Sequence, residues 1–199
     1  CRAWRSHPLA GTVDVTTSPD APTTSCPGGL RHPTGVAVDG LDRLYVTESA
    51  GRAVMIADLW SGRVVRRVAT RGRAVDVVAE TGEPGAVVVT ASPHRMMRID
   101  GGSRPCARSE PLVAPCGHPD LAPARIALLS GRMVVLWRGD DTAILADEAG
   151  RELLEEPSAT DIAGTPQGLL VVARGPDESF HRFWERGGAF VEGEPVAAA

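Results

Sequence analysis

The sequence predicts an all-β protein, a β-propeller of four-stranded antiparallel blades, and three observations lead to this expectation. Short runs rich in Val, Ile and Leu alternate with turns that contain Gly, Asp and Ser, as in a meander of antiparallel strands. A unit of four such strands recurs about every forty residues. The second strand of each unit is almost wholly apolar, which is typical of strands buried on both faces.

The clearest unit spans residues 32–68. Its strands are expected at residues 36–38, 44–46, 54–57 and 64–68, with Gly, Asp or Ser in each intervening turn. Four strands in about forty residues match one blade of a propeller. A single blade cannot fold alone, because its faces are buried only by neighbouring blades, so the unit must recur.

Three weaker copies of this unit follow. Their opening strands are expected at residues 74–78, 123–128 and 160–163, and their second strands at 86–89, 133–137 and 169–172. Third strands end on Asp58, Asp100 and Asp147, each followed closely by Gly as in a recurring hairpin turn. The fourth copy departs from that pattern, with a third strand expected at residues 180–185. A β-sandwich also spaces short strands regularly, but it does not repeat one strand order four times.

The chain is expected to divide into a partial blade with a linker and four complete blades. The expected bounds are residues 1–31 for the partial blade and approximately 32–72, 73–120, 121–158 and 159–196 for the others. About four and a half blades suggest a fragment of a larger propeller or a processed product; the alternative is an irregular small propeller whose half blade docks as an edge. An unpaired edge is a template for pairing with another chain, so Trp4 and Val13 are candidate partner-binding residues.

Composition and charge narrow the classes of function. A chain of 199 residues can bury a substantial core as one domain, and packing relies on Val, Ala and Leu because only 4% of residues are aromatic. All 21 basic residues are Arg, and the net charge of −4 argues against a general nucleic-acid surface. The given chain contains no run approaching the roughly 20 apolar residues of a membrane span and no signal-peptide pattern. A cytoplasmic assembly and a secreted particle both remain open as locations.

The four cysteines permit two disulfides, most simply Cys1–Cys26 and Cys106–Cys116, which would close nearby loops. Four cysteines allow three pairings, and free thiols are equally acceptable in a chain of this size. Cys106, Cys116 and His118 are a weak alternative set of zinc ligands, but their spacing matches no Cys-x-x-Cys knuckle. We therefore expect neither a metal nor another cofactor.

The first unit resembles an NHL-type repeat, in which a Pro-x-Gly-Val-Ala-Val-Asp opening, here residues 33–39, leads into Arg-Leu-Tyr-Val, here residues 43–46. This resemblance is strong over residues 32–68 and loose elsewhere. The segment from Trp4 to Val15, followed by the first unit, is also similar to propeller proteins that accompany phage-tail-like contractile injection particles of actinobacteria. The first resemblance implies a β-propeller, and the second implies a structural or baseplate-associated role.

Motifs for catalysis are absent from the sequence. It contains no Gly-x-Ser-x-Gly elbow, Walker loop, His-Glu-x-x-His or Gly-x-Gly-x-x-Gly fingerprint. Propeller enzymes similar to gluconolactonases or peptide-amidating lyases hold a metal in the central channel, and the lactonase-like cage uses Asn, which this chain lacks. The polar residues expected on or beside the inner strands are Asp39, Asp76, Arg125 and Asp161. Their expected role is to form hydrogen bonds and to solvate the mouth of the channel. A lactonase-like or amidating-lyase-like enzyme with a metal in the channel is the alternative function.

The expected function is a non-enzymatic propeller scaffold that mediates protein–protein interaction, as a structural component of a larger assembly such as a phage-tail-like particle. Propellers display broad loop faces on a rigid scaffold, although the fold alone does not define function. The candidate contacts are aromatic and Met side chains expected to be exposed in loops: Trp60, Met96, Phe180 and Trp184. Their alternative role is to cap the grooves between blades. The expected partners are protein subunits or the remainder of the same polypeptide, with neither nucleic acid nor a membrane.

Overall fold

The computed structural model describes residues 30–80, 84–100, 107–175, 179–186 and 189–193. Sixteen strands and no helix occur among these residues, and the strands form four separate sheets. Every sheet contains four strands that are consecutive in the chain and pair antiparallel. The all-β class and the four-stranded blades are therefore confirmed.

The four blades follow one another along the chain. Blade 1 contains β1 (Pro33–Val38), β2 (Arg43–Glu48), β3 (Ala53–Asp58) and β4 (Val64–Ala69), and blade 2 contains β5 (Arg73–Ala79), β6 (Gly85–Ala91), β7 (Arg95–Asp100) and β8 (Ala107–Pro111). Blade 3 contains β9 (Ala122–Leu129), β10 (Arg132–Arg138), β11 (Ala143–Asp147) and β12 (Glu152–Glu155), and blade 4 contains β13 (Ala159–Gly164), β14 (Leu169–Arg174), β15 (Ser179–Arg186) and β16 (Ala189–Glu192). The opening strands of blades 2, 3 and 4 begin one residue before their expected starts, and β1 begins three residues before its expected start.

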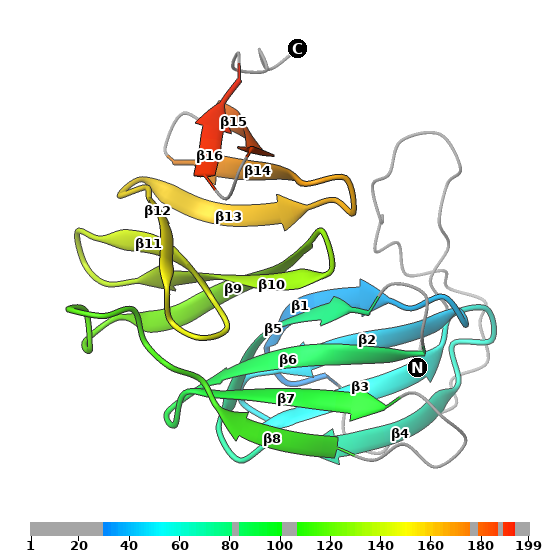
Figure 1. Cartoon of the computed structure of the whole chain (residues 1–199). Helices are drawn as coiled ribbons and strands as arrows, with labels where there is room; N and C mark the ends of the chain where they lie inside the picture. The colour runs from blue at the N-terminus through cyan, green and yellow to red at the C-terminus, as the bar shows by residue number, and fades with distance from the viewer. Residues whose placement is uncertain (1–29, 81–83, 101–106, 176–178, 187–188, 194–199) are drawn as a thin grey trace.

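The blades stack on one another with their first strands innermost (Figure 1). Strand β1 packs beside β5, β5 beside β9, and β9 beside β13. Within the described part of the chain, β13 and β1 make no comparable contact, and blade 4 packs on blade 3 alone. The four blades therefore form an open arc whose two end blades each have a face turned away from the stack.

Apolar clusters fill the three spaces between successive blades. Tyr45 and Val77 belong to the cluster between blades 1 and 2, Val89 and Trp137 to the one between blades 2 and 3, and Leu170 to the one between blades 3 and 4. Burying a large apolar side chain contributes about 1.5–3 kcal/mol, so these junctions supply the main favourable term in folding.

Two of the acidic residues that end third strands hold the following turn. The Asp58 carboxylate accepts hydrogen bonds from the Ser61 N–H at 2.7 Å and the Ser61 hydroxyl at 2.6 Å, which lower the pKa of Asp58. Asp147 accepts the N–H groups of Ala149 and Arg151 at 3.0 and 2.9 Å. A short carboxylate that binds backbone N–H groups in its own turn explains why Asp recurs at this point of the repeat.

The prediction that Met96 is exposed in a loop is wrong, because Met96 lies on β7 and is only 7% exposed. Strand β7 lies between two blades, so Met96 packs toward blade 3 while Met97 packs toward blade 1. Phe180 and Trp184 are exposed as expected, but they lie on β15 rather than in loops. In the described ranges no helix is long and apolar enough to cross a membrane.

Candidate functional site

The four inner strands share one irregularity, a β-bulge near the start of each strand. The residue that follows the bulge occupies an equivalent position in every blade, and the four residues at this position are Gly35, Asp76, Arg125 and Asp161. Bulges re-aim the side chains next to them, and here they turn three charged residues toward neighbouring inner strands. The structure thus brings together three of the four polar residues that the sequence places near the channel.

Asp76 connects three blades. Its Oδ1 accepts the N–H of Val77 at 2.9 Å, and its Oδ2 accepts the N–H of Ile126 in blade 3 at 3.0 Å. On the other side Gly35 of blade 1 approaches so closely that a Cβ there would lie 2.2 Å from Oδ1. Burial raises the pKa of Asp76 to about 6, although both N–H donors and Arg125 oppose that shift.

Arg125 and Asp161 link blades 3 and 4. The Arg125 Nε lies 3.2 Å from Asp161 Oδ1, and this oxygen also accepts the N–H of Ile162 at 2.9 Å. The pair is partly exposed, with 35% of the Arg125 side chain and 60% of the Asp161 side chain open to solvent. An exposed pair of this kind contributes 0–1 kcal/mol to stability, so it orients the carboxylate more than it holds the blades together.

Asp39 has a structural role. It is 5% exposed, and its carboxylate accepts the N–H groups of Leu41 and Arg43 at 2.9 and 3.0 Å and the Tyr45 hydroxyl at 2.8 Å. Burial, together with the bond to Asp39, raises the pKa of Tyr45. By accepting these three hydrogen bonds, the Asp39 carboxylate holds the β1–β2 hairpin closed. It therefore has a structural role and does not serve as a polar group of the channel.

The channel residues offer little acid–base or metal chemistry. No group of three or more His, Cys, Asp or Glu side chains in the described ranges is arranged to hold a metal ion. His94 and His181 lie away from the inner strands. His181 on β15 binds Glu192, and the His94 ring contacts the Trp137 ring edge-on, with 5.3 Å between the ring centroids. Among the described residues, Asp76 is the channel carboxylate whose pKa approaches neutrality.

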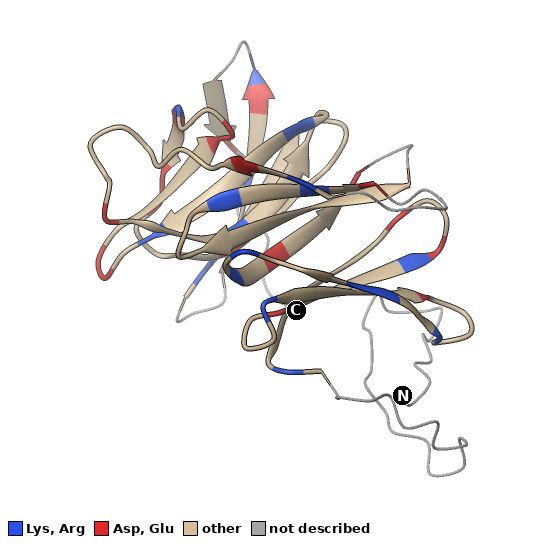
Figure 2. Cartoon of the chain, turned by 90° about the horizontal axis from the view of Figure 1, so that it is seen from below, with Lys and Arg blue, Asp and Glu red and all other residues tan. Residues whose placement is uncertain are grey.

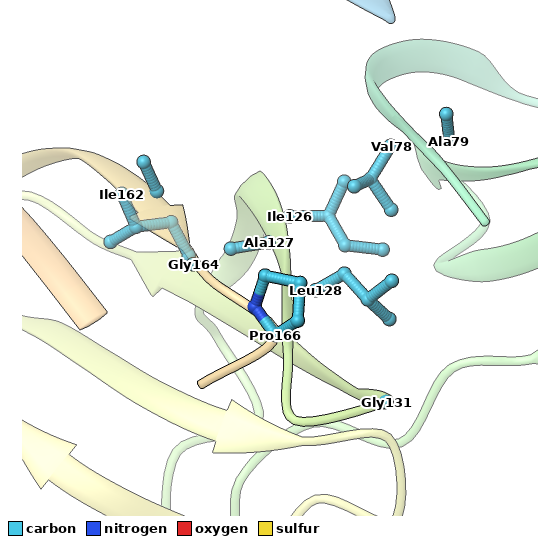
Figure 3. A pocket seen from close by; sticks show the side chains of 10 residues that line it. Val78, Ala79, Ile126, Ala127, Leu128, Gly131, Ile162, Gly164 and Pro166 are labelled. Atoms are coloured by element: carbon cyan, nitrogen blue, oxygen red, sulfur yellow. The ribbon is translucent and has the colours of Figure 1, made fainter. Parts of the chain in front are cut away.

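An apolar groove of about 300 Å³ runs along the inner strands of blades 2, 3 and 4 (Figure 3). Val78, Ile126, Leu128 and Pro166 are among the side chains that line it. A second groove of about 250 Å³ shares Leu128 and is bordered by charged residues. Small-molecule sites of this size usually combine apolar walls with a few convergent polar groups, and the first groove is lined entirely by apolar residues and glycine.

Large apolar side chains are exposed on the face of blade 4 that is turned away from blade 3. Phe180 and Trp184 on β15 are 42% and 39% exposed, and Val191, which pairs with Trp184 from β16, is 48% exposed. In the turn after β3, Trp60 is 76% exposed. The structure brings Phe180 and Trp184 together on one strand and places Trp60 on a different blade.

Several predicted site residues lie outside the described part of the chain. Trp4 and Val13 are among them, as are Cys1, Cys26 and Cys106. Cys116 is described and is exposed. The disulfide pairings and the alternative zinc set of Cys106, Cys116 and His118 therefore stay predictions.

The sequence analysis missed the exposed residues of the inner strands. Val36 on β1 is 61% exposed and Val38 is 44% exposed, and Ala163 on β13 is also exposed. Val77 and Ile126, the equivalents of Val36 in the middle blades, are buried. A Val or Ile occurs at the position of Val36 in all four units. The sequence therefore predicts an apolar contact at this position, but it does not show whether a neighbouring blade is present to make that contact.

Comparisons with solved structures show the fold. The chain is similar to the β-propeller domain of Cps50 (Swd1) from Myceliophteria thermophila, with a TM-score of 0.61 and 13% identity over 86% of this chain and 60% of that one. It is similar to the RRP9 WD40 repeats, with a TM-score of 0.59 and 15% identity over 82% of this chain and 53% of that one. It is also similar to a streptogramin B lyase, with a TM-score of 0.62 and 14% identity over 84% of this chain and 56% of that one.

No protein-family model matches the sequence, and no curated protein matches it. The chain spans 53–60% of the length of the propeller structures named above. Those structures include WD40 repeats and a lyase, so the shared architecture is compatible with both binding and catalysis. The comparisons show that the chain has the architecture of a β-propeller.

Proposed function

We propose that this chain is a non-enzymatic β-propeller scaffold that binds protein as a structural component of a larger assembly. The observation that carries the proposal is the outer face of blade 4, where Phe180, Trp184 and Val191 are exposed together. Aromatic residues on a rigid sheet are favoured at protein–protein contacts, and contiguous exposed apolar groups mark such contacts. The NHL-type resemblance of blade 1 and a place in a phage-tail-like particle are finer parts of the same proposal.

The distribution of charge supports protein over nucleic acid as the partner. Figure 2 shows Arg and acidic residues interspersed over the blades instead of gathered on one side. A nucleic-acid surface needs a continuous positive stripe, and the whole chain has a net charge of −4. The exposed face of blade 4 presents Phe180, Trp184 and Val191, which suits a partner that presents apolar groups of its own.

A photo-crosslinking residue in place of Phe180 tests the proposal. In extracts of the producing cells, we expect this residue to form a covalent adduct with one defined protein, because Phe180 is exposed on this face of blade 4. The same residue in place of Val65, which is 58% exposed on β4 of blade 1, is the control and should yield no such adduct. Equal labelling from both positions, or no protein adduct from Phe180, would contradict the proposal.

Catalysis in the channel is a second candidate function, favoured by the Asp76 carboxylate. Its pKa of about 6 suits a general base near neutral pH, and Ile126, which binds it, also lines the apolar groove. If the chain were a lactonase or lyase, Asp76→Asn would abolish turnover and leave the crosslink at Phe180 unchanged. We expect instead that neither the wild-type protein nor the variant converts lactone or streptogramin-type substrates.

A further inference from the structure

From the two grooves at the ends of the inner strands we infer that the protein has a binding site for a small primary amine that carries an apolar body. The apolar body lies in the first groove, and the ammonium group lies in the second groove, beside Glu148 and Glu80. This ligand is additional to the protein partner proposed above, and the inference does not rest on the exposed face of blade 4.

The two grooves meet at the turn between β9 and β10. Leu128, near the end of β9, and Gly131, in the turn, line both of them. The grooves measure about 300 and 250 Å³, so together they fall within the roughly 300–1,000 Å³ that small-molecule sites occupy. Such sites combine apolar walls with a few polar groups, and here each groove supplies one of these two features.

The first groove has apolar side chains that keep part of their surface open. Val78 on β5, Leu128 on β9 and Pro166 after β13 come from three different blades (Figure 3). Val78 and Leu128 are half-buried and Pro166 is exposed, whereas Ile126 and Ile162, which also line the groove, are buried. Covering the open apolar surface is the favourable term for a ligand with an apolar body.

Contacts between blades 3 and 4 fix the shape of the first groove. The Ser130 N–H donates to the Thr165 carbonyl at 3.2 Å, which joins the turns after β9 and β13. Gly164 approaches β9 so closely that a Cβ there would lie 2.3 Å from the Leu128 carbonyl oxygen. Because the walls are already held in place, little ordering of the protein opposes binding.

The second groove carries a negative charge that is only partly balanced. The charged residues that line it are Arg98, Glu80 and Glu148. Arg98 forms an ion pair with Glu80. The Glu148 Oε2 accepts the Met133 N–H at 3.3 Å, and within the described part of the chain this carboxylate forms no ion pair. A positively charged ligand group beside Glu148 therefore complements the groove.

The chemistry of the walls favours a primary ammonium group over a quaternary one. Quaternary ammonium groups are recognised by the faces of aromatic rings, and the described residues that line the two grooves include no aromatic side chain. A primary ammonium group has three N–H donors, which suit carboxylate oxygens. An anionic ligand would meet two carboxylates and a guanidinium that Glu80 already binds, so the groove disfavours it.

Methyl NMR titrations of the whole chain with three matched probes test this inference. The probes are 4-phenylbutylamine, the uncharged 4-phenylbutanol and the anionic 4-phenylbutyrate. We expect the amine to shift the methyl signals of Leu128 and Val78 saturably, with a dissociation constant on the order of 1 mM. The alcohol should bind about fivefold more weakly and the carboxylate more weakly still. The methyl signals of Val65, on β4 of blade 1, are the control and should not move.

Three variants separate the contribution of charge from that of the apolar wall. Glu148→Gln should weaken binding of the amine about fivefold and leave binding of the alcohol unchanged, because the alcohol makes no ion pair. Glu155→Gln is the matched control, since it removes the same charge from an exposed position on β12 that lies outside both grooves. Leu128→Ala should weaken the amine and the alcohol alike, because both use the apolar wall.

Several results would overturn the inference. They are no saturable binding of the amine up to about 10 mM, equal affinity for the three probes, and equal effects of Glu148→Gln and Glu155→Gln. Loss of amine binding in Asp161→Asn but not in Glu148→Gln would place the amine at the opposite end of the inner strands and would also contradict the site. Thermal unfolding checks that each variant folds, and Val78→Ala replaces Leu128→Ala as the test of the apolar wall if the latter is unfolded.

Discussion

At the scale of single residues, Gly35 is required by the close approach of blade 2. A Cβ at this position would lie 2.2 Å from Asp76 Oδ1 and 2.9 Å from the Asp76 Cα, and the latter is backbone that cannot rotate away. We expect Gly35→Ala to destabilise the protein by about 1–3 kcal/mol, the usual cost of overpacking. Gly40→Ala is the control, because a Cβ there meets no atom within 4 Å. Urea unfolding that shows the same midpoint for both variants would refute this role.

The Asp76 carboxyl makes the stability of the protein depend on pH. Its pKa is raised from 3.8 to about 6 by burial, so between these values the folded state binds more protons than the unfolded state. The free energy of unfolding should therefore fall by about 2 kcal/mol as the pH rises from 4 to 7, relative to a protein without this group. Urea titrations of the wild-type and Asp76→Asn proteins at several pH values measure the difference. Parallel pH profiles for the two proteins would show that Asp76 does not titrate as described.

At the scale of the strands, an ion pair between the buried Glu48 and the half-exposed Arg67 ties β2 to β4. The Glu48 side chain is fully buried, and Arg67 binds both of its oxygens at 2.7 and 2.5 Å while the Arg31 N–H binds one of them at 3.0 Å. Arg67→Ala would leave a buried carboxylate without its cation, and we expect a loss of about 3 kcal/mol in unfolding free energy. Arg151→Ala removes an exposed pair with Asp147 and should cost less than about 1 kcal/mol. Equal losses in the two variants, measured by urea unfolding, would contradict this ranking.

The strands were predictable from sequence because each blade repeats a local pattern. Alternation, Gly and Asp in the turns and the apolar second strand place three opening strands within one residue of their observed starts and the first within three residues. The three charged residues of the inner strands were also identified, but the bulge that makes Asp76, Arg125 and Asp161 equivalent leaves no mark in a single sequence. The burial of Met96 could not be predicted from the sequence either, because the burial of a third strand depends on the neighbouring blade that packs against it.

At the scale of the whole molecule, the arc is a linear stack in which each blade is stabilised by its neighbours. Blade 3 has a blade on each side, whereas blade 4 packs against described residues of blade 3 alone. This asymmetry predicts that the stack opens from blade 4 first. It also explains why the same sequence pattern gives fully buried residues on β10 and half-buried ones on β14.

Hydrogen exchange of the monomeric chain measures this order of opening. The amides of β14 should exchange at least about tenfold faster than those of β10, because fewer buried contacts must be broken to release them. Gly164→Ala should widen the gap, since a Cβ at Gly164 would lie 2.3 Å from the Leu128 carbonyl oxygen and press blade 4 away from blade 3. In that variant β6 should keep its wild-type rate, and Gly40→Ala should alter neither strand. If Gly164→Ala accelerated exchange in all blades equally, the arc would unfold as one cooperative unit and blade 4 would not be the site at which it opens.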